Sequence, residues 1–414
     1  MTLATVTRTT WNASEVASSH KTFLKFRVPS GFSVDVPNCR FWPKQSLGQN
    51  VVAYTGNRTL IRTIKGPWKG QVKVLSERAR LDTAPLSELS SSTGKRILFV
   101  LPGNAVGDNV GYFLFLQSVL EALAPSRVAV MNSGGASDIY HLDSRIEVFP
   151  LWIEHAELRG FDLVVDFMEV PRLRKIAESP CDPEVTLTDF ADLPPTKAYS
   201  TAPRQSGKPA SVSIFPLASS PMRSLPLDLC RFLIGKATQS NLPVAVHLNG
   251  MQRQSAFYER GLQDLESPTV KLHRGSSSLG DLFSVMENVD YGIFCDSGPA
   301  HLSKLTATRG IAVHTSAEAG VLRGRFTNLG IWQSNYVGKY CAAPCGLAGP
   351  WVDAAGRIGC MGSLTVPRSE LKERAILVDE VTNRAMIEHP IPCVDHLNHT
   401  KQQIWEAIET SWSL

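Results

Sequence analysis

The sequence of 414 residues contains no long apolar run and no cluster of basic residues. A membrane span needs about 20 consecutive apolar residues, so we expect no membrane-spanning segment. The opening residues, MTLATVTRTTWNASEVASSH, lack the basic start and apolar core of a secretory signal, which predicts a cytoplasmic protein. The net charge is only +4, and without a run of Lys or Arg no nucleic-acid surface is predicted.

Two common nucleotide-binding motifs are also missing. The sequence has neither GxGxxG nor GxxxxGK[ST], so simple dehydrogenases and P-loop enzymes are not favoured. Its composition, with 43% hydrophobic and 19% charged residues, is typical of a soluble globular protein. The length predicts two or three domains, since a single core rarely grows so large.

The chain has eight cysteines, which in a cytoplasmic protein are thiols or metal ligands more often than disulfides. Four are scattered and are interpreted as structural: Cys39, Cys181, Cys230 and Cys295. The other four gather in the last quarter of the chain, in loops with Gly and Pro: Cys341, Cys345, Cys360 and Cys393. Four thiolates suit a tetrahedral zinc or iron site. The alternative is four unrelated buried thiols.

The first 95 residues differ in pattern from the rest. Short, alternating β-branched runs such as KTFLKFRVPSGFSVDV and GQVKVLSERARL are split by Gly, Pro and Asn. They predict a small antiparallel sheet or barrel over residues 1–95. The polar run SELSSSTGK then indicates a linker.

From residue 96 onward, apolar strands alternate with helical segments, which predicts an α/β fold with parallel sheets. The Pro/Ser/Lys-rich stretch DLPPTKAYSTAPRQSGKPA divides this pattern into two Rossmann-like halves, residues 96–205 and 206–340. Two such halves predict a ligand cleft between them, with a nucleotide as the usual guest. The last segment, 396–414, has helical spacing, and we expect it either to brace the first half or to be a terminal core helix.

One strand-to-helix corner, FCDSGPAHLSKL, concentrates polar residues. Asp296 and Ser297 end an apolar strand, Gly298 allows close backbone approach, and Pro299 fits a first helical turn. Free N–H groups at such a helix start predict a site for phosphate or diphosphate, with His301 in the same turn. The alternative is a routine capped helix with a surface histidine.

Four segments of this chain resemble the ADP-heptose glycosyltransferases, the heptosyltransferase family with the GT-B fold. They occur in the family's order: PGNAVGDNVGYFLFLQSV, IFPLASSPMRSLPLD, SSSLGDLFSVMENVDYGIF and CDSGPAHLSKL. The resemblance implies two Rossmann-like domains facing a cleft, an acceptor-side half over 96–205 and a nucleotide-sugar-binding half over 206–340. It also implies inverting transfer with no metal at the active site.

The resemblance implies a role for each matched residue. Asp108 takes the place of the general base, although a plain helix N-cap would also explain it. Arg223 stands where the family usually has Lys and would clamp the diphosphate, which Arg can do bidentately. The remaining donor-binding residues would be Ser219, Ser220, Asn249, Gly250, Asp296, Ser297, Gly298 and His301. For Asn249 and Gly250, a simple turn is the alternative to a place beside the adenine.

The whole chain is similar to the bacterial autotransporter heptosyltransferases. That resemblance implies an N-terminal β-barrel, a GT-B core, a four-cysteine iron finger over residues 341–395 and a large ring-like homo-oligomer. It also implies transfer of heptose from ADP-heptose to serines of an autotransporter adhesin, with structural iron and zinc as the alternative metal. Two other functions stay open: transfer to lipopolysaccharide or another glycan, and a non-catalytic nucleotide-sugar-binding scaffold.

Overall fold

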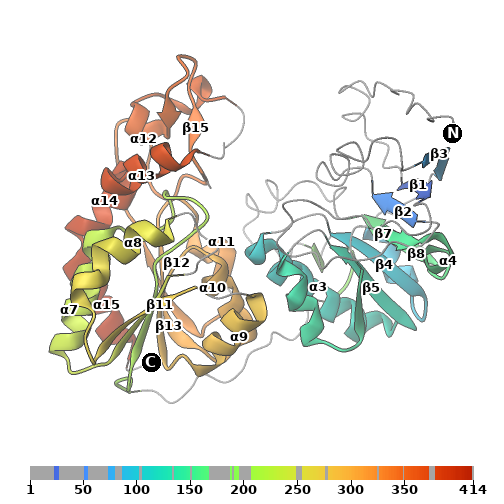
Figure 1. Cartoon of the computed structure of the whole chain (residues 1–414), viewed down its shortest axis with the longest axis horizontal. Helices are drawn as coiled ribbons and strands as arrows, with labels where there is room; N and C mark the ends of the chain where they lie inside the picture. The colour runs from blue at the N-terminus through green and yellow to red at the C-terminus, as the bar shows by residue number, and fades with distance from the viewer. Residues whose placement is uncertain are drawn as a thin grey trace, which may run out of the picture. The chain divides into compact units, whose positions relative to one another are not determined.

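The computed structural model describes residues 23–27, 51–54, 73–79, 86–101, 105–132, 135–149, 152–166, 187–188, 191–194, 207–248, 254–275, 278–323, 326–347, 349–372 and 378–412. The chain divides into two compact units (Figure 1). Unit 1 holds Met1–Lys175 and Glu184–Thr196, and unit 2 holds Ile176–Pro183 and Lys197–Leu414. Within the described residues, no helix is long and apolar enough to cross a membrane.

Unit 1 contains a four-stranded parallel sheet in the order β6-β5-β4-β8. Its strands are β4 (Arg96–Leu101), β5 (Arg127–Asn132), β6 (Ile146–Phe149) and β8 (Leu163–Asp166). The long helix α3 (Val106–Leu123) connects β4 to β5, and the 3-10 helix η2 (Gly135–Leu142) connects β5 to β6. The alternation of apolar strands and helical segments predicted from residue 96 onward is confirmed in this unit.

A second, antiparallel sheet in unit 1 has the order β3-β1-β2-β7. Three strands come from the first 95 residues and one from further along: β1 (Phe23–Arg27), β2 (Val51–Tyr54), β3 (Lys73–Ala79) and β7 (Trp152–Glu154), which leads into α4 (His155–Leu158). The predicted antiparallel strands are therefore present, but the sheet borrows its edge strand from the following half. A barrel-like closure would depend on residues outside the described part.

The polar run expected to be a linker is instead folded. Residues Leu86–Ser91 form the 3-10 helix η1. Leu89 and Ser92 are completely buried, and the Ser92 hydroxyl donates a hydrogen bond of 3.0 Å to the carbonyl of Glu88. The linker prediction was wrong because one leucine in a serine-rich stretch is enough to anchor a turn in the core.

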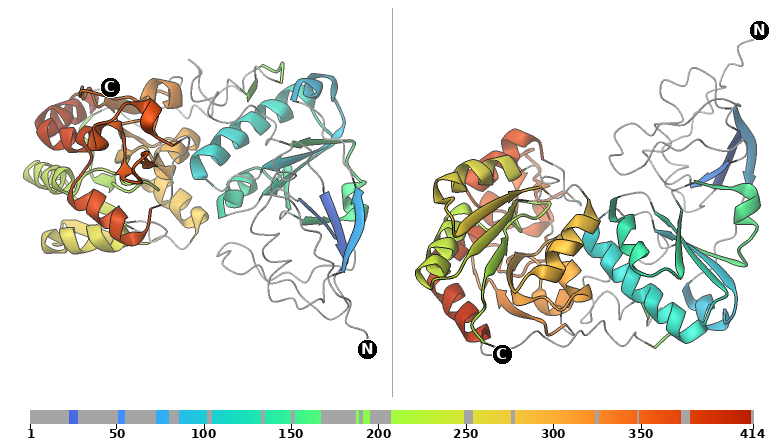
Figure 2. Two further views of the ribbon diagram at one scale, coloured as in Figure 1. Left: turned by 90° about the horizontal axis from the view of Figure 1, so that it is seen from above. Right: turned by 60° about the horizontal axis from the view of Figure 1, so that its bottom comes forward.

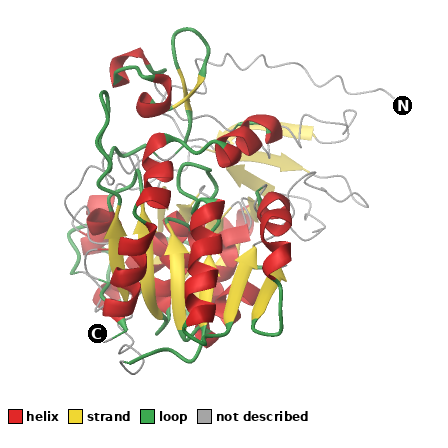
Figure 3. Ribbon diagram, turned by 90° about the vertical axis from the view of Figure 1, so that its left-hand side faces the viewer, coloured by secondary structure: helices red, strands yellow, loops and turns green. Residues whose placement is uncertain are grey.

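Unit 2 is built on a six-stranded parallel sheet in the order β11-β10-β9-β12-β13-β14 (Figure 3). The strands are β9 (Val212–Phe215), β10 (Val244–Leu248), β11 (Val270–Arg274), β12 (Tyr291–Cys295), β13 (Arg309–His314) and β14 (Leu329–Gln333). The helices are α7 (Leu227–Gln239), α8 (Ser255–Leu262), α9 (Leu279–Asn288), α10 (Gly298–Leu302) and α11 (Ala319–Arg323), with η3 (Gln263–Leu265) after α8 and η4 (Ser303–Leu305) after α10. The predicted α/β class is thereby confirmed.

Helices cover both faces of this sheet (Figures 1 and 2). On one face, α7, α8 and the C-terminal helix α15 (Lys401–Ser411) pack a large apolar core against inward-facing Val and Ile residues of the strands. On the other face lie α9 and α10, and the facing strand residues there include Phe215 and Phe294. A sheet buried on both faces explains why its strands have near-continuous apolar sequences.

The C-terminal helix was expected to brace the first half or to serve as a terminal core helix, and the second alternative is confirmed. Ile404, Trp405 and Ile408 of α15 are buried in the core of unit 2. The Tyr291 hydroxyl is hydrogen-bonded to Ser411, and the N–H of Gly207 donates to the carbonyl of Trp412 at 2.6 Å. The last helix is therefore fastened to the sheet of its own unit.

The cysteine-rich segment forms a small subdomain of short elements. They are β15 (Trp351–Val352), β16 (Ile358–Gly359), α12 (Met361–Leu364), η5 (Arg368–Glu370), α13 (Glu380–Glu388) and α14 (Pro392–His399). A separate apolar cluster holds it together, and its members include Leu347, Trp351, Met361 and Ile391. Met222 from the loop after β9 belongs to the same cluster, which connects the subdomain to the sheet of unit 2.

Candidate donor site

The order of strands in unit 2 creates a point where the chain direction across the sheet reverses. β9 and β12 are parallel neighbours, with Phe215 opposite Phe294. From β9 the chain proceeds to β10 and β11 on one side, and from β12 to β13 and β14 on the other. Loops leaving two such strands diverge, and ligands of open α/β sheets bind in the resulting crevice at the strands' carboxyl ends.

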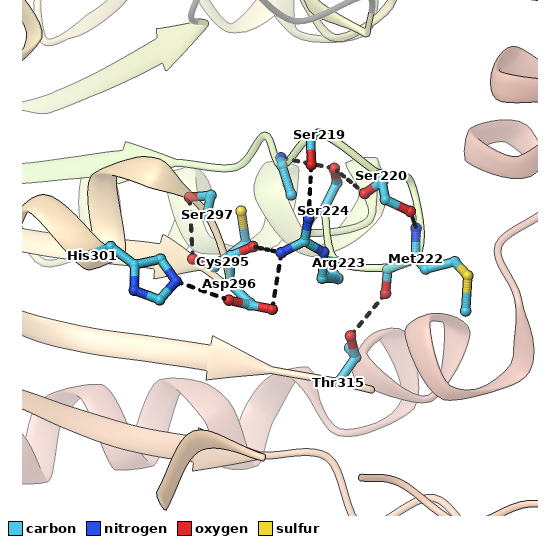
Figure 4. Close-up of polar contacts among 11 residues, drawn as sticks. Ser219, Ser220, Met222, Arg223, Ser224, Cys295, Asp296, Ser297, His301 and Thr315 are labelled. Atoms are coloured by element: carbon cyan, nitrogen blue, oxygen red, sulfur yellow. Dashed lines mark hydrogen bonds and ion pairs between the residues drawn. The ribbon is translucent and has the colours of Figure 1, made fainter. Parts of the chain in front are cut away.

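The two loops at this point are joined by one arginine (Figure 4). Arg223, in the loop after β9, donates from Nη1 to the Oδ2 of Asp296 at 3.2 Å and to the Asp296 carbonyl at 3.3 Å. Its Nη2 donates to the hydroxyl of Ser219 at 2.7 Å. Three predicted donor-binding residues, which come from both sides of the switch point, thus form one hydrogen-bonded group.

Asp296 is the buried partner of this group. Its side chain is 2% exposed, against 18% for Arg223. Burial raises the pKa of a carboxyl group, but the charge of Arg223 outweighs that effect and holds the pKa of Asp296 well below its ordinary value. The carboxylate is therefore ionised at neutral pH, and its Oδ1 is buried without a hydrogen-bond partner among the residues that the structure describes.

Two histidines stand near this carboxylate. The Nε2 of His301 lies 3.7 Å from Oδ1 of Asp296, which is too long for a hydrogen bond, and its side chain is 15% exposed. Burial lowers the pKa of His301, with Asp296 opposing that shift. Burial also lowers the pKa of His314, at the end of β13, to about 4. Both imidazoles are consequently neutral at pH 7.

The helix that follows Asp296 is short. α10 has five residues, with Pro299 in its first turn as predicted, and it continues as the 3-10 helix η4. The Ser297 hydroxyl does not cap it but donates to the carbonyl of Cys295 at 3.2 Å. The N–H of His301 is bonded to the Ser297 carbonyl, so Gly298 and Ala300 carry the first-turn amides that the helix itself does not bond.

The two serines assigned to the loop after β9 have different surroundings. Ser219 accepts the hydrogen bond from Arg223, whereas the Ser220 hydroxyl is buried and accepts from the N–H of Met222 at 3.3 Å. Ser220 therefore shapes the loop. Two residues that the motifs did not single out do the same: Ser224 accepts from the N–H of Ala218 at 3.0 Å, and Thr315 donates to the carbonyl of Met222 at 2.8 Å.

A cavity of about 100 Å³ lies at the same edge of the sheet. Its lining comes from the ends of β9, β10 and β11 and from α9 and α10: Phe215, Leu217, His247, Leu248, His273, Gly275, Leu282, Val285 and Pro299. Four nearly parallel rings from adjacent strands run beside it, with centroids 4.9 Å apart for Phe294–Phe215, 4.5 Å for Phe215–His247 and 4.8 Å for His247–His273. Asn249 and Gly250 lie outside the described residues.

Asp108, the proposed base, lies in unit 1. It is the third residue of α3 and is partly exposed. The N-cap of this helix is Ala105, so the alternative in which Asp108 is a plain N-cap is wrong. An acid in the first turn still favours the helix, typically by about 0.3–1 kcal/mol. Burial raises the pKa of Tyr112 and Tyr140, and the negative charge of Asp108 raises both further.

The four clustered cysteines line one cavity. Its volume is about 10 Å³, roughly that of a single water-sized sphere. All four thiols border it: Cys341, Cys345, Cys360 and Cys393. Burial raises the pKa of the Cys341, Cys345 and Cys393 thiols, and the neighbouring thiols raise it further. Gly362 keeps the space open, because a Cβ there would come within 3.0 Å of the Cys341 Sγ.

These thiols share a cavity without forming a finished ligand set. In the part of the chain that the structure describes, no group of three or more His, Cys, Asp or Glu side chains is placed to hold a metal ion. Four cysteines that converge on a cavity of this size fit a metal ion held by four thiolates, whereas the positions of their sulfur atoms do not. Of the scattered cysteines, Cys230 and Cys295 are buried in unit 2 as expected for structural thiols, and Cys39 and Cys181 lie outside the described residues.

The chain is similar to several solved structures. One is the E. coli heptosyltransferase WaaC with ADP-2-deoxy-2-fluoro heptose, at 12% identity and a TM-score of 0.41, covering 58% of this chain and 93% of WaaC. Another is a glycosyl transferase family 9 protein from Veillonella parvula, at 11% identity and a TM-score of 0.49, covering 78% and 98%. A third is the iron-containing dodecameric glycosyltransferase TibC from enterotoxigenic E. coli, at 11% identity and a TM-score of 0.44, covering 77% and 79%.

No protein-family model matches the chain, and no curated protein matches its sequence. The structures to which it is similar include heptosyltransferases, the family that its four segments resemble.

Proposed function

We propose that this protein is a glycosyltransferase that binds a nucleotide-heptose, ADP-heptose, in unit 2 and transfers its sugar with inversion. The observation that carries the proposal is the Arg223–Asp296 pair at the switch point between β9 and β12. A cation held by a buried carboxylate at this edge of a parallel sheet suits the diphosphate of a nucleotide.

Each donor-site group has a distinct task in this proposal. Arg223 neutralises the departing diphosphate, and the first-turn amides of Gly298 and Ala300 add hydrogen bonds to it. Asp296 is too buried to be a major sugar contact, so it acts mainly by fixing the guanidinium of Arg223. His301, neutral and partly exposed, serves as a hydrogen-bond partner for the sugar or phosphate.

The cavity beside the four stacked rings suits the base of the nucleotide. It is lined mostly by apolar side chains, and His247, whose two faces are covered by Phe215 and His273, borders it with the edge of its ring. Asn249 and Gly250 follow β10 directly, so we propose them as neighbours of the adenine.

The transfer itself needs one base and one leaving group. The acceptor oxygen bonds to the anomeric carbon while the carbon–oxygen bond to the diphosphate breaks and ADP departs. Asp108 takes the proton of the attacking hydroxyl, a task that requires a carboxylate within hydrogen-bond reach of the acceptor in the donor complex. No metal is needed at this step, because Arg223 and the amides offset the charge of ADP.

We propose a serine of an autotransporter adhesin as the acceptor, in the cytoplasm and before export. The support is the combination of an N-terminal β-rich segment and a four-cysteine cluster, which the motifs alone do not require. Extension of a lipopolysaccharide or another glycan is the second candidate, since donor residues persist across acceptors. We also propose a homo-oligomer, as the sequence resemblance to the autotransporter heptosyltransferases implies; TibC is described as dodecameric.

The cysteine cluster is proposed to hold structural iron, with zinc as the alternative. Cys341, Cys345, Cys360 and Cys393 would be its ligands. A metal closed by four thiolates supplies cross-links between loops and has no open position for chemistry. Burial and, after it, the mutual repulsion of the thiolates raise the pKa values of Cys341 and Cys393, and attraction to one cation would offset both effects.

One experiment tests the function as a whole. The purified chain is incubated with ADP-heptose and either a serine-containing adhesin fragment or a lipopolysaccharide core. The masses of the products are then measured by mass spectrometry. The proposal expects a mass increase of one heptose on the adhesin fragment and none with ADP-hexose. Binding of ADP-heptose without any transfer would favour the non-catalytic scaffold instead.

A further inference from the structure

A network of buried polar side chains lies under the start of α3. The amide oxygen of Asn109 accepts two hydrogen bonds, 2.6 Å from the Tyr140 hydroxyl and 2.8 Å from the Nδ2 of Asn132. Asn132 also donates to the carbonyl of Leu101 at 3.0 Å. The Asn109 Nδ2 donates to the carbonyl of Ala105 at 2.9 Å. All three side chains are almost completely buried.

The network joins four elements at one edge of the unit 1 sheet. Leu101 ends β4, Asn132 ends β5, Tyr140 belongs to η2 and Asn109 lies in the first turn of α3. Burying three polar side chains is costly unless their hydrogen bonds are made, and an apolar core would hold these elements equally well. Such a network therefore holds the four elements in precise positions at the carboxyl ends of the strands.

The start of α3 is held by this network. Its N-cap, Ala105, carries only a methyl group, which cannot accept a hydrogen bond from the first-turn amides. Instead the Ala105 carbonyl receives both the N–H of Asn109, at 3.1 Å, and the Asn109 side chain. The rotation of the first turn about the helix axis is thus set by one buried amide.

Asp108 immediately precedes this amide in the same turn. Adjacent helical residues project about 100° apart, so the buried Asn109 fixes the direction in which the partly exposed Asp108 leaves the helix. The negative charge of Asp108 acts on Tyr140, whose pKa is raised mainly by burial and further by that charge. The network and the carboxylate therefore share one small region.

We propose that Asn109, held by Asn132 and Tyr140, is a positioning residue that orients Asp108 toward the acceptor hydroxyl. This inference rests on the proposed function, in which Asp108 is the base. A misplacement of the base by about 1 Å can lower a rate roughly 100-fold, while the donor in unit 2 binds as before.

The test compares Tyr140→Phe and Asn109→Ala with Ser92→Ala as the matched control. Tyr140→Phe removes one hydroxyl and leaves the Asn132–Asn109 bond, so the protein is expected to fold. Ser92→Ala also removes a buried hydroxyl of unit 1, one that donates to a carbonyl within its own turn. Steady-state transfer from ADP-heptose and thermal unfolding are measured for each.

Tyr140→Phe is expected to lower kcat roughly 10- to 100-fold with KM for ADP-heptose unchanged within twofold, and Asn109→Ala to lower kcat at least as much. Ser92→Ala is expected to lower Tm comparably and leave kcat within twofold. An active wild type, an inactive Asp108→Ala and an unimpaired Tyr140→Phe would overturn the positioning role alone. A wild type that transfers no sugar, or an Asp108→Ala variant as active as the wild type, would overturn the proposed function and this inference with it.

Discussion

The guanidinium of Arg223 lies 3.2 Å from the carboxylate of Asp296, although the two residues are 73 positions apart in the chain. They meet because β9 and β12 are neighbours in the sheet. Arg223 lies in the loop after β9, and Asp296 directly follows β12. Arg223 reaches the edge where a ligand would bind, and Asp296 stays beneath it. The pair thus behaves as an anchored cation, and most predictions for the donor site depend on this anchoring.

Removing the cation should weaken donor binding and destabilise unit 2. Arg223→Met leaves Asp296 as an unpaired buried charge, which typically costs about 3–5 kcal/mol. It also removes a charge-assisted contact to the diphosphate, worth about 1.5–3 kcal/mol, so the Kd for ADP should rise roughly 10- to 150-fold. Calorimetric titration with ADP and thermal unfolding measure both effects. Arg223→Lys, which keeps the charge, should recover part of each; equal ADP affinity in all three proteins would exclude Arg223 from the site.

Removing the proposed base should separate binding from chemistry. Asp108→Ala is expected to bind ADP with a Kd within twofold of the wild type, because Asp108 belongs to unit 1 and the donor residues to unit 2. Transfer should fall by about 100- to 10,000-fold, the usual contribution of a positioned base. Undiminished turnover in this variant would remove Asp108 from the mechanism.

The cysteine cluster should determine the metal content of the protein. We expect about one iron per chain by elemental analysis, and less than about a fifth of that in Cys360→Ser and Cys393→Ser. The matched control is Cys295→Ala, a buried thiol of β12 outside the cluster, which should keep its iron. Zinc at one equivalent would favour the alternative metal, and a metal-free wild type of full stability would contradict a metal at this site.

Stability should decline in mildly acidic solution. Burial lowers the pKa of both His247 and His314 to about 4, against about 6.5 in an unfolded chain. Between these values the unfolded chain binds more protons than the folded one, so the free energy of unfolding decreases as pH falls from about 6.5 to about 4. Each histidine should contribute about 3 kcal/mol to this loss.

Urea unfolding at pH 7 and pH 5 measures the slope of stability against pH. His314→Gln should flatten it, because the variant cannot take up that proton. An identical slope in the His314 variant would contradict the assignment.

The amino-acid pattern predicted the parallel strands of both units because apolar runs with β-branched residues are a local signal. It missed β6, β11 and β14, which all lie at sheet edges; β11, for example, includes charged and histidine side chains between its apolar residues. The residues from Gly298 to Leu305 have helical spacing whether they form an α-helix or a 3-10 turn, so spacing could not give the end of α10. Local pattern therefore indicated the class of fold and not the extent of each element.

In the candidate site too, the sequence motifs identified residues but not the contacts between them. Motif resemblance selected Ser219, Arg223 and Asp296, yet their hydrogen bonds depend on the order of strands, which no local spacing encodes. For Asp108, the Gly-Asp-Asn context was compatible with an N-cap, and only the folded helix assigns that position to Ala105. The Asn109 network could not be predicted because its three members come from three separate segments.

The antiparallel pairing of β2 with β7 has a consequence for how the chain can be divided. A fragment beginning at residue 96 would keep Trp152–Glu154 but lose the strand whose backbone groups they pair with. The exposed edge would then be open to pairing with other chains, as unprotected strand edges generally are. The strand Val51–Tyr54 thus supplies the backbone partners of β7, and a truncation placed by composition alone would leave β7 unpaired and produce a fragment prone to aggregation.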